Sequence, residues 1–150
     1  MIRGVLFVCV GNLCRSPMAA GVLGHAMPGM KVASAGIHAQ TGAAADPSAI
    51  AIMRERGIDI ETHRAQPLTR ALCAAHDVIF VMDEPLKNHV LFRYPQLRGR
   101  VRKLSERCIA DPYQQSYAAF VDCYTHVAEA VGVWRPRLHA LARVSARGAS

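Results

Sequence analysis

The chain has 150 residues, of which 51% are hydrophobic and 19% are charged, and its formal net charge is +7. This length predicts a single domain over residues 1–150, and the composition excludes a disordered chain. No apolar run approaches the ~20 residues of a membrane-spanning helix, so we expect no membrane insertion. The short apolar stretch near the N-terminus predicts a first strand rather than a secretory signal, which indicates a cytoplasmic protein.

Apolar runs alternate with helix-start signals along the chain. Strands are predicted over 3–8, 31–35, 77–82 and 100–104. Helices are predicted over 17–26, 47–56, 70–75 and 84–93, and over a long stretch from about 114 in which Pro136 causes a kink or a restart. The expected N-caps are Ser16, Asp46, Thr69 and Asp83. This alternation predicts an α/β fold with a parallel sheet between helices, and such sheets bind ligands at the carboxyl ends of their strands.

The five cysteines are odd in number and lack the spacing of a disulfide framework or a zinc site. Cys73, Cys108 and Cys123 are scattered along the chain, and small buried thiols are their simplest interpretation. We therefore expect reduced thiols, no metal and no cofactor.

Arginine supplies most of the positive charge, and it gathers in residues 93–107 and 135–147. Such patches bind nucleic acid, steer anionic substrates or simply face solvent. For the C-terminal group we favour a solvent-exposed face. For the first group, charge alone does not separate an anionic phosphoprotein from RNA as the partner.

A cysteine and an arginine enclose the segment between the first predicted strand and the first predicted helix. Five residues lie between Cys9 and Arg15, and a helix N-terminus with unpaired N–H groups follows. Gly11 and Asn12 are the residue types most able to take the positive φ that a tight anion-binding turn needs. The Cys-x5-Arg pattern is weak evidence alone, but this context favours a loop that wraps a phosphate.

Each part of this loop has a chemical task. At a helix N-terminus the thiolate of Cys9 is favoured, so it can attack phosphorus and form a cysteinyl-phosphate that water later hydrolyses. Arg15 offers a planar fork to two phosphate oxygens. Ser16 can donate a hydrogen bond to the thiolate and also cap the helix. Asp111 is available as proton donor to the leaving group, although by spacing alone Asp111-Pro112 is more simply a turn.

The chain resembles the low-molecular-weight protein tyrosine phosphatases. The matching segments follow the family's order and spacing across nearly the whole chain: Val8 to Pro17, Ser34-Ala35-Gly36, Asp46-Pro47, His63, Met82-Asp83 and Asp111-Pro112-Tyr113. The resemblance implies a three-layer fold whose four-stranded parallel sheet has the order 2-1-3-4, with the phosphate loop after the first strand. It also implies hydrolysis of phosphotyrosine without a metal.

The resemblance assigns roles to residues of this chain. Cys9 is the implied nucleophile, Arg15 the phosphate clamp, and Asp111 the general acid that later activates water. The implied phosphate- and substrate-binding residues are Val10, Gly11, Asn12, Leu13, Cys14, Ser16 and Tyr113. Ser34 and His63 are implied to hold the loop rigid. Cys14 matches a second loop cysteine, which suggests a reversible Cys9–Cys14 disulfide that protects the nucleophile.

Residues 94–101 and 37–40 resemble the bacterial branch of the family that is tied to capsule and exopolysaccharide export. This implies a tyrosine-phosphorylated protein as the partner, namely an autophosphorylating tyrosine kinase with a tyrosine-rich tail, and no nucleic acid. Two departures from the family pattern stand out. Gln40 occupies a position where these relatives tend to be apolar, which predicts a more polar pocket rim. Gln66 follows Ala65, where an Ala-Arg pair is usual.

Three alternatives share parts of this pattern. An arsenate reductase on the same fold needs further cysteines after the third strand, and residues 81–99 contain none. A phosphoarginine phosphatase is associated with a small polar residue at position 13, whereas Leu13 favours a flat aromatic ring. A non-catalytic phosphate-binding module needs neither nucleophile nor acid, so the joint presence of Cys9, Arg15 and Asp111 argues against it.

Overall fold

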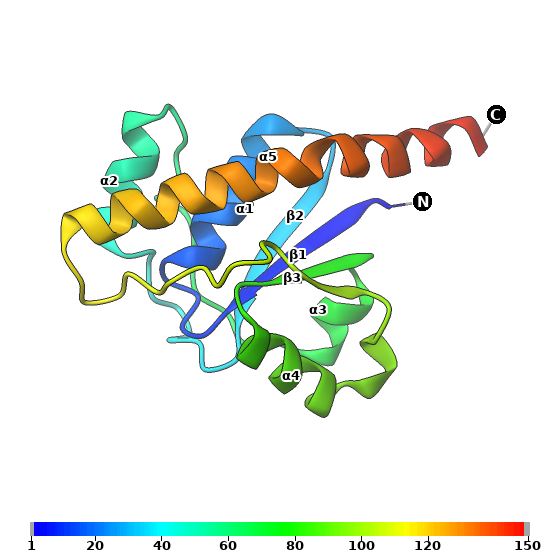
Figure 1. The fold of residues 1–150 in the computed structure, drawn as a ribbon, viewed down its shortest axis with the longest axis horizontal. Coiled ribbons are helices and arrows are strands. Elements are labelled where there is room, and N and C mark those ends of the chain that lie inside the picture. The colour runs from blue at the N-terminus through cyan, green and yellow to red at the C-terminus, as the bar shows by residue number, and fades with distance from the viewer. Residues whose placement is uncertain (1, 149–150) are drawn as a thin grey trace.

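The computed structural model describes residues 2–148, with the backbone alone from 143 to 148. Its strands are β1 (Gly4–Cys9), β2 (Lys31–Gly36), β3 (Val78–Val81) and β4 (Val101–Lys103), which form one parallel sheet in the order β2-β1-β3-β4. The helices are α1 (Arg15–Ala26), α2 (Pro47–Glu55), α3 (Arg70–Ala74), α4 (Glu84–Arg93) and α5 (Tyr117–Gly148), with a 3-10 turn at Pro95–Leu97. Helices α1, α2 and α5 cover one face of the sheet, and α3 and α4 cover the other (Figure 1). The predicted three-layer fold and strand order are confirmed.

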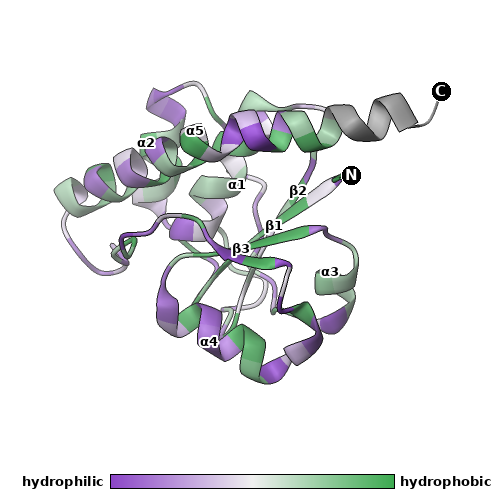
Figure 2. Cartoon of the chain, turned by 45° about the vertical axis from the view of Figure 1, so that its right-hand side comes forward, coloured by the Kyte–Doolittle hydropathy of each residue, from purple (hydrophilic) through white to green (hydrophobic). Residues whose placement is uncertain are grey.

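The central strand β1 is buried along its whole length. Its ring at Phe7 stacks on Phe80 of β3 at 5.5 Å between centroids, and Phe80 in turn meets Trp134 of α5 at 4.9 Å. Strands β1 and β3 are largely hydrophobic, while the helices carry hydrophilic residues on their outer sides (Figure 2). A strand buried on both faces is typical of parallel sheets. Cys9, the last residue of β1, is therefore attached to a strand that is buried on both faces.

Three helices begin at the predicted caps, and one does not. The side chains of Asp46, Thr69 and Asp83 each accept a hydrogen bond from a backbone N–H in the first turn of α2, α3 and α4. Helix α1 begins at Arg15, so Ser16 lies inside its first turn, and the predicted cap at Ser16 is wrong. The hydroxyl of Ser16 is instead hydrogen-bonded within the loop, as described below.

The long helix α5 starts later than predicted and is not interrupted. Gln114 has a φ of 60°, in the left-handed region, so the helix cannot begin there. Ser116 Oγ accepts a hydrogen bond from Ala119 N at 3.2 Å and caps the helix instead. The helix continues through Pro136, so the predicted restart does not occur. Among residues 2–148, no helix is long and apolar enough to cross a membrane.

Candidate active site

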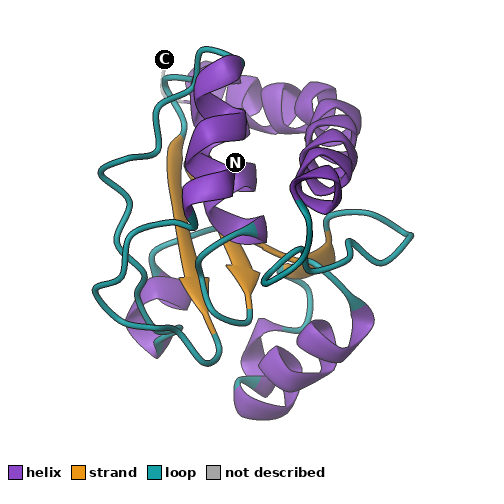
Figure 3. Ribbon diagram, turned by 90° about the vertical axis from the view of Figure 1, so that its left-hand side faces the viewer, coloured by secondary structure: helices purple, strands orange, loops and turns teal. Residues whose placement is uncertain are grey.

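The segment between β1 and α1 turns the chain at the carboxyl edge of the sheet, where several loops converge (Figure 3). Of the two residues expected to allow this turn, Asn12 takes a φ of 59° and Gly11 does not take a positive φ. A non-glycine residue in the left-handed region needs compensation from its surroundings. Hydrogen bonds to Asn12 supply this compensation.

Asn12 is completely buried, and its side chain makes three hydrogen bonds. Its Nδ2 donates to Ser16 Oγ at 2.8 Å and to Ser34 Oγ at 3.0 Å. Its Oδ1 accepts from the backbone N–H of Gln66 at 3.0 Å. Gln66 Nε2 also donates to the carbonyl of Ser34 at 3.0 Å. The buried amide thus ties the loop to α1, to β2 and to the segment before α3.

His63 supports the same residue from outside the loop. Its Nε2 lies 2.8 Å from the carbonyl oxygen of Asn12, and because a carbonyl only accepts, Nε2 carries the proton. Burial lowers the pKa of His63, and the nearby Arg64 charge lowers it further, while the hydrogen bond to Asn12 acts in the opposite direction. The neutral ring is therefore favoured at neutral pH, and it binds the loop without adding charge beside the phosphate site.

The thiol of Cys9 is buried and lies 2.8 Å from Ser16 Oγ. Because Ser16 Oγ already accepts a hydrogen from Asn12 Nδ2, its own proton is free to point toward the sulfur. The arrangement is a donor chain from Asn12 through Ser16 to Cys9. Such a chain suits a sulfur that carries negative charge.

The segment after β2 holds the loop's carbonyl groups away from the site. The backbone N–H groups of Ile37, His38 and Gln40 donate to the carbonyl oxygens of residues 9–11, at 3.1, 2.9 and 3.3 Å. Within the described part of the chain, residues 11–14 donate no backbone hydrogen bond. Their N–H groups are available for an anion, as in other backbone cradles that bind phosphate.

Gly36, the last residue of β2, makes this close approach possible. A Cβ at this position would lie 2.4 Å from the carbonyl oxygen of Val10 and 3.0 Å from Asn12 N. Both neighbours are backbone atoms, which cannot swing away. No local pattern around Gly36 predicts this contact with residue 10, which lies 26 positions earlier in the chain.

Arg15 is buried and held by three groups. Its guanidinium donates to Asp83 Oδ2 at 3.1 Å and to the carbonyl of Ile109 at 2.9 Å, and it lies 3.8 Å from Asp111 Oδ2. Asp83 serves two purposes, since its other oxygen accepts from Leu86 N at the start of α4. The local sequence predicts Asp83 as a helix cap and carries no signal for its contact with Arg15, which lies 68 positions away.

Asp111 and Tyr113 lie on the loop before α5 and face the phosphate loop from the opposite side. Asp111 Oδ1 accepts from the backbone N–H of Tyr113 at 3.1 Å, and its side chain is 44% exposed. Gln40 Nε2 donates to the hydroxyl of Tyr113 at 3.4 Å. A polar contact therefore joins the two rims of the pocket, in line with the polar rim expected from Gln40.

These parts surround one cavity of about 130 Å³. Its lining comprises Cys9, Val10, Gly11, Leu13, Cys14, Arg15, His38, Gln40, Asp111 and Tyr113. Of the residues predicted from the sequence, Asn12, Ser16, Ser34 and His63 lie behind this lining as its support. In the described residues, no group of three or more His, Cys, Asp or Glu side chains could hold a metal ion.

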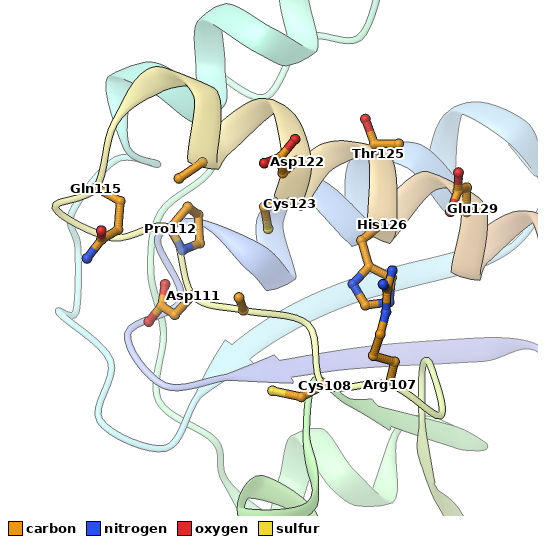
Figure 4. Close-up of a pocket in the computed structure, with 12 residues that line it drawn as sticks. Arg107, Cys108, Asp111, Pro112, Gln115, Asp122, Cys123, Thr125, His126 and Glu129 are labelled. Atoms are coloured by element: carbon orange, nitrogen blue, oxygen red, sulfur yellow. The ribbon is translucent and has the colours of Figure 1, made fainter.

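A larger cavity, of about 710 Å³, lies between the loop that carries Asp111 and helix α5 (Figure 4). Asp111 points away from the end of this cavity where Arg107 and His126 lie. The cavity lacks both Cys9 and Arg15, so the smaller cavity is the candidate phosphate site despite its size.

Cys14, at the end of the loop and in the cavity lining, is buried, and its thiol is free, as is that of Cys9. Burial raises the pKa of Cys14, and the charges of Asp46 and Asp111 raise it further. Cys14 therefore stays a neutral thiol at neutral pH. The Cys9–Cys14 disulfide remains a prediction.

Comparison with known proteins identifies the protein family to which the chain belongs. Residues 4–144 match the family model described as low molecular weight phosphotyrosine protein phosphatase. The chain is 45% identical over 144 residues to the probable low molecular weight protein-tyrosine-phosphatase EpsP of Ralstonia nicotianae, covering 94% of this chain and 99% of that protein. It therefore belongs to the low molecular weight protein-tyrosine-phosphatase family and is an enzyme of that class.

Solved structures agree with this assignment. The tyrosine phosphatase Wzb from Escherichia coli K30, in complex with sulphate, superimposes with a TM-score of 0.89 at 31% identity, covering 92% of this chain and 99% of that one. The YwlE arginine phosphatase from Geobacillus stearothermophilus has a TM-score of 0.87 at 28% identity, covering 91% and 93%. The fold is thus shared by enzymes named for different phosphorylated residues.

Replacement of Gly36 by alanine is expected to damage the site more than the fold. The new Cβ must push the backbone at Val10 outward, which costs about 1–3 kcal/mol of unfolding free energy and displaces the N–H cradle. We expect a large loss of kcat/KM on p-nitrophenyl phosphate. Denaturant unfolding of the same protein measures the accompanying loss of stability. Gly132→Ala is the control, since its Cβ meets nothing within 4 Å and activity should not change.

Replacement of Asp83 by asparagine is expected to reduce activity about 10- to 100-fold, because Arg15 loses its closest charged partner and its orientation. Asn remains a good N-cap, so α4 should persist. Asp46→Asn is the matched control: Asp46 also caps a helix, by accepting from Ser48 N, without touching Arg15. Equal activity of the two variants, measured as kcat/KM, would contradict the role given to Asp83.

Proposed function

We propose that this chain hydrolyses phosphotyrosine in proteins by a two-step displacement on Cys9, without a metal ion. The observation that carries the proposal is the single cavity lined together by Cys9, Arg15 and Asp111. A thiol, a guanidinium and a carboxyl group are the three functions that the reaction needs.

In the first step the Cys9 thiolate attacks phosphorus, and the bond from phosphorus to the phenolic oxygen breaks. The carboxylic acid of Asp111 gives its proton to that oxygen, so tyrosine leaves neutral and a cysteinyl-phosphate remains. Arg15 and the N–H groups of residues 11–14 hold the three other oxygens. These donors are in place before substrate arrives, so little reorganisation is needed in the transition state.

In the second step the carboxylate of Asp111 takes a proton from water as the water oxygen attacks phosphorus. The phosphorus–sulfur bond breaks, inorganic phosphate leaves, and the Cys9 thiolate is restored. The hydroxyl of Ser16, 2.8 Å from the sulfur, supports its departure as an anion. Asp111 thus acts first as acid and then as base, which its partly exposed position permits.

The chemical proposal predicts a distinct response to each of two variants. Cys9→Ser should abolish turnover, while Asp111→Asn should reduce it about 100-fold or more on a phosphotyrosine peptide and less on p-nitrophenyl phosphate, whose leaving group needs less protonation. Steady-state kinetics with and without EDTA measure both effects, and EDTA should have none. Cys108→Ser is the control, because this exposed thiol lies outside the loop. Turnover by Cys9→Ser at the wild-type rate would refute the mechanism.

We infer that the physiological substrate is an autophosphorylated tyrosine kinase of capsule or exopolysaccharide production. Similarity to proteins named EpsP and Wzb, together with the resemblance of residues 37–40 and 94–101 to that branch, supports this inference. Leu13, 8% exposed in the cavity wall, and the ring of Tyr113 offer two surfaces for a flat phenyl group. This favours phosphotyrosine over phosphoarginine.

A non-catalytic module that binds RNA through the basic stretch is less well supported. The guanidinium of Arg100 is engaged with the backbone carbonyls of Cys73 and His76. Arg93 lies over the ring of Tyr94, 5.3 Å from its centroid. These arginines are partly structural. The side chains of Arg143 and Arg147, in the C-terminal group, lie outside the described residues.

A substrate trap tests the identity of the partner. Cys9→Ser protein should retain a tyrosine-phosphorylated protein kinase from a lysate of the source organism, because the phosphate cradle is intact while hydrolysis is blocked. Mass spectrometry identifies the retained protein and its modified residue, and vanadate should release it. A retained protein that carries phosphoarginine, or one insensitive to vanadate, would contradict the inferred substrate.

A further inference from the structure

Phe92, on α4, has 89% of its surface exposed, more than any other large hydrophobic residue described. Single exposed hydrophobic residues are common and need no explanation by themselves. The position of Phe92 on α4 relates it to the phosphate cavity. Helix α4 begins beside the loops at the carboxyl edge of the sheet and runs away from them (Figure 1), so it leads outward from the phosphate cavity.

A pair of histidines joins the cavity to this helix. His38 lines the cavity mouth, where its backbone N–H donates to Val10 O. Its ring meets His89 of α4 edge to face, with centroids 6.0 Å apart and an interplanar angle of 69°. Residues three apart on a helix share a face, so Phe92 follows His89 along α4. His38, His89 and Phe92 are therefore placed in succession, from the cavity lining outward along α4.

We propose that this strip, defined as His38, His89 and Phe92, binds the polypeptide that flanks the phosphotyrosine, and that Phe92 receives an apolar side chain of the substrate. The inference rests on the proposed function and extends it to substrate selection. Its occupant is the substrate itself, because His38, at one end of the strip, lines the cavity that takes the phosphotyrosine.

The distances along the strip predict how far the apolar side chain of the substrate lies from its phosphotyrosine. The 6.0 Å between the histidine rings and the ~4.5 Å rise of three helical residues add up to a path of roughly 10 Å along the strip from His38 to the position of Phe92. An extended peptide covers ~3.3 Å per residue, so the apolar side chain lies about three to five positions from the phosphotyrosine.

The charge around the strip indicates the rest of the preferred sequence. Residues 85–98 include Lys87, Arg93 and Arg98 and contain no aspartate or glutamate. The two acidic residues that precede them, Asp83 and Glu84, are paired with Arg15 and Lys103. Acidic residues beside the apolar one would therefore be favoured, and basic ones disfavoured. The predicted substrate segment is acidic, with one apolar side chain at a set distance from the phosphorylated tyrosine.

The test uses phosphotyrosine peptides on an acidic background, in which one leucine is moved through the six positions on either side of the tyrosine. Wild-type protein should show kcat/KM raised about fivefold or more when leucine lies three to five positions away on one side. Phe92→Asp should lose this preference, whereas Val133→Asp, at a residue 74% exposed on α5, should keep it. p-Nitrophenyl phosphate, which is too small to reach Phe92, reports the chemistry separately.

The outcomes separate the two proposals. A flat leucine profile, or the same profile in Phe92→Asp, with normal p-nitrophenyl phosphate turnover, would overturn the strip and leave the phosphatase intact. Absence of p-nitrophenyl phosphate turnover in the wild type would overturn the proposed function and the strip with it. Self-association that Phe92→Asp abolishes, with an unchanged peptide profile, would assign the surface to a second copy of the chain and overturn the strip.

Discussion

The direction of the peptide groups between Cys9 and Arg15 is the constraint on which the rest of the structure depends. Carbonyl oxygens turned into the cavity would repel a phosphate, so they must be paired elsewhere. Backbone N–H groups of the segment after β2 donate hydrogen bonds to these carbonyl oxygens and so continue the pattern of the sheet. The close contact at Gly36 allows the two segments to approach each other. The buried amide of Asn12 then holds the one left-handed residue of the turn. The loop from Cys9 to Arg15 thus continues the hydrogen bonding of the sheet beyond β1 and β2.

Two acidic side chains lie near the guanidinium of Arg15, and they differ in distance and exposure. A buried guanidinium must be paired, and Arg15 has Asp83 as a close partner that is itself fixed at the start of α4. Asp111 is farther from Arg15 and more exposed. In the mechanism we propose, phosphate takes the place beside Arg15 while Asp83 keeps the guanidinium oriented. The exposed carboxyl group of Asp111 then exchanges its proton with the leaving group and with water.

Local signals predicted most of the fold. Asp46, Thr69 and Asp83 cap helices because an N-cap needs only its own side chain and the next turn. The same reasoning failed at Ser16, whose hydroxyl is engaged by Asn12 and Cys9. It also failed at the start of α5, where the backbone of Gln114 is left-handed. In both places a contact or a conformation outside the local pattern outweighed the propensity.

The sequence by itself determined the order of strands and helices along the chain and the loop from Cys9 to Arg15. These follow from periodicity, caps and motif, which are properties of neighbouring residues. The distant Asp111 was predicted only through the family resemblance. Only the tertiary structure decided that Gly36 must lack a side chain, that Asp83 orients Arg15, and that Gln66 helps to hold Asn12. Each of these depends on atoms brought together across 24 to 68 positions of the chain. Such contacts are set by packing, which no local pattern encodes.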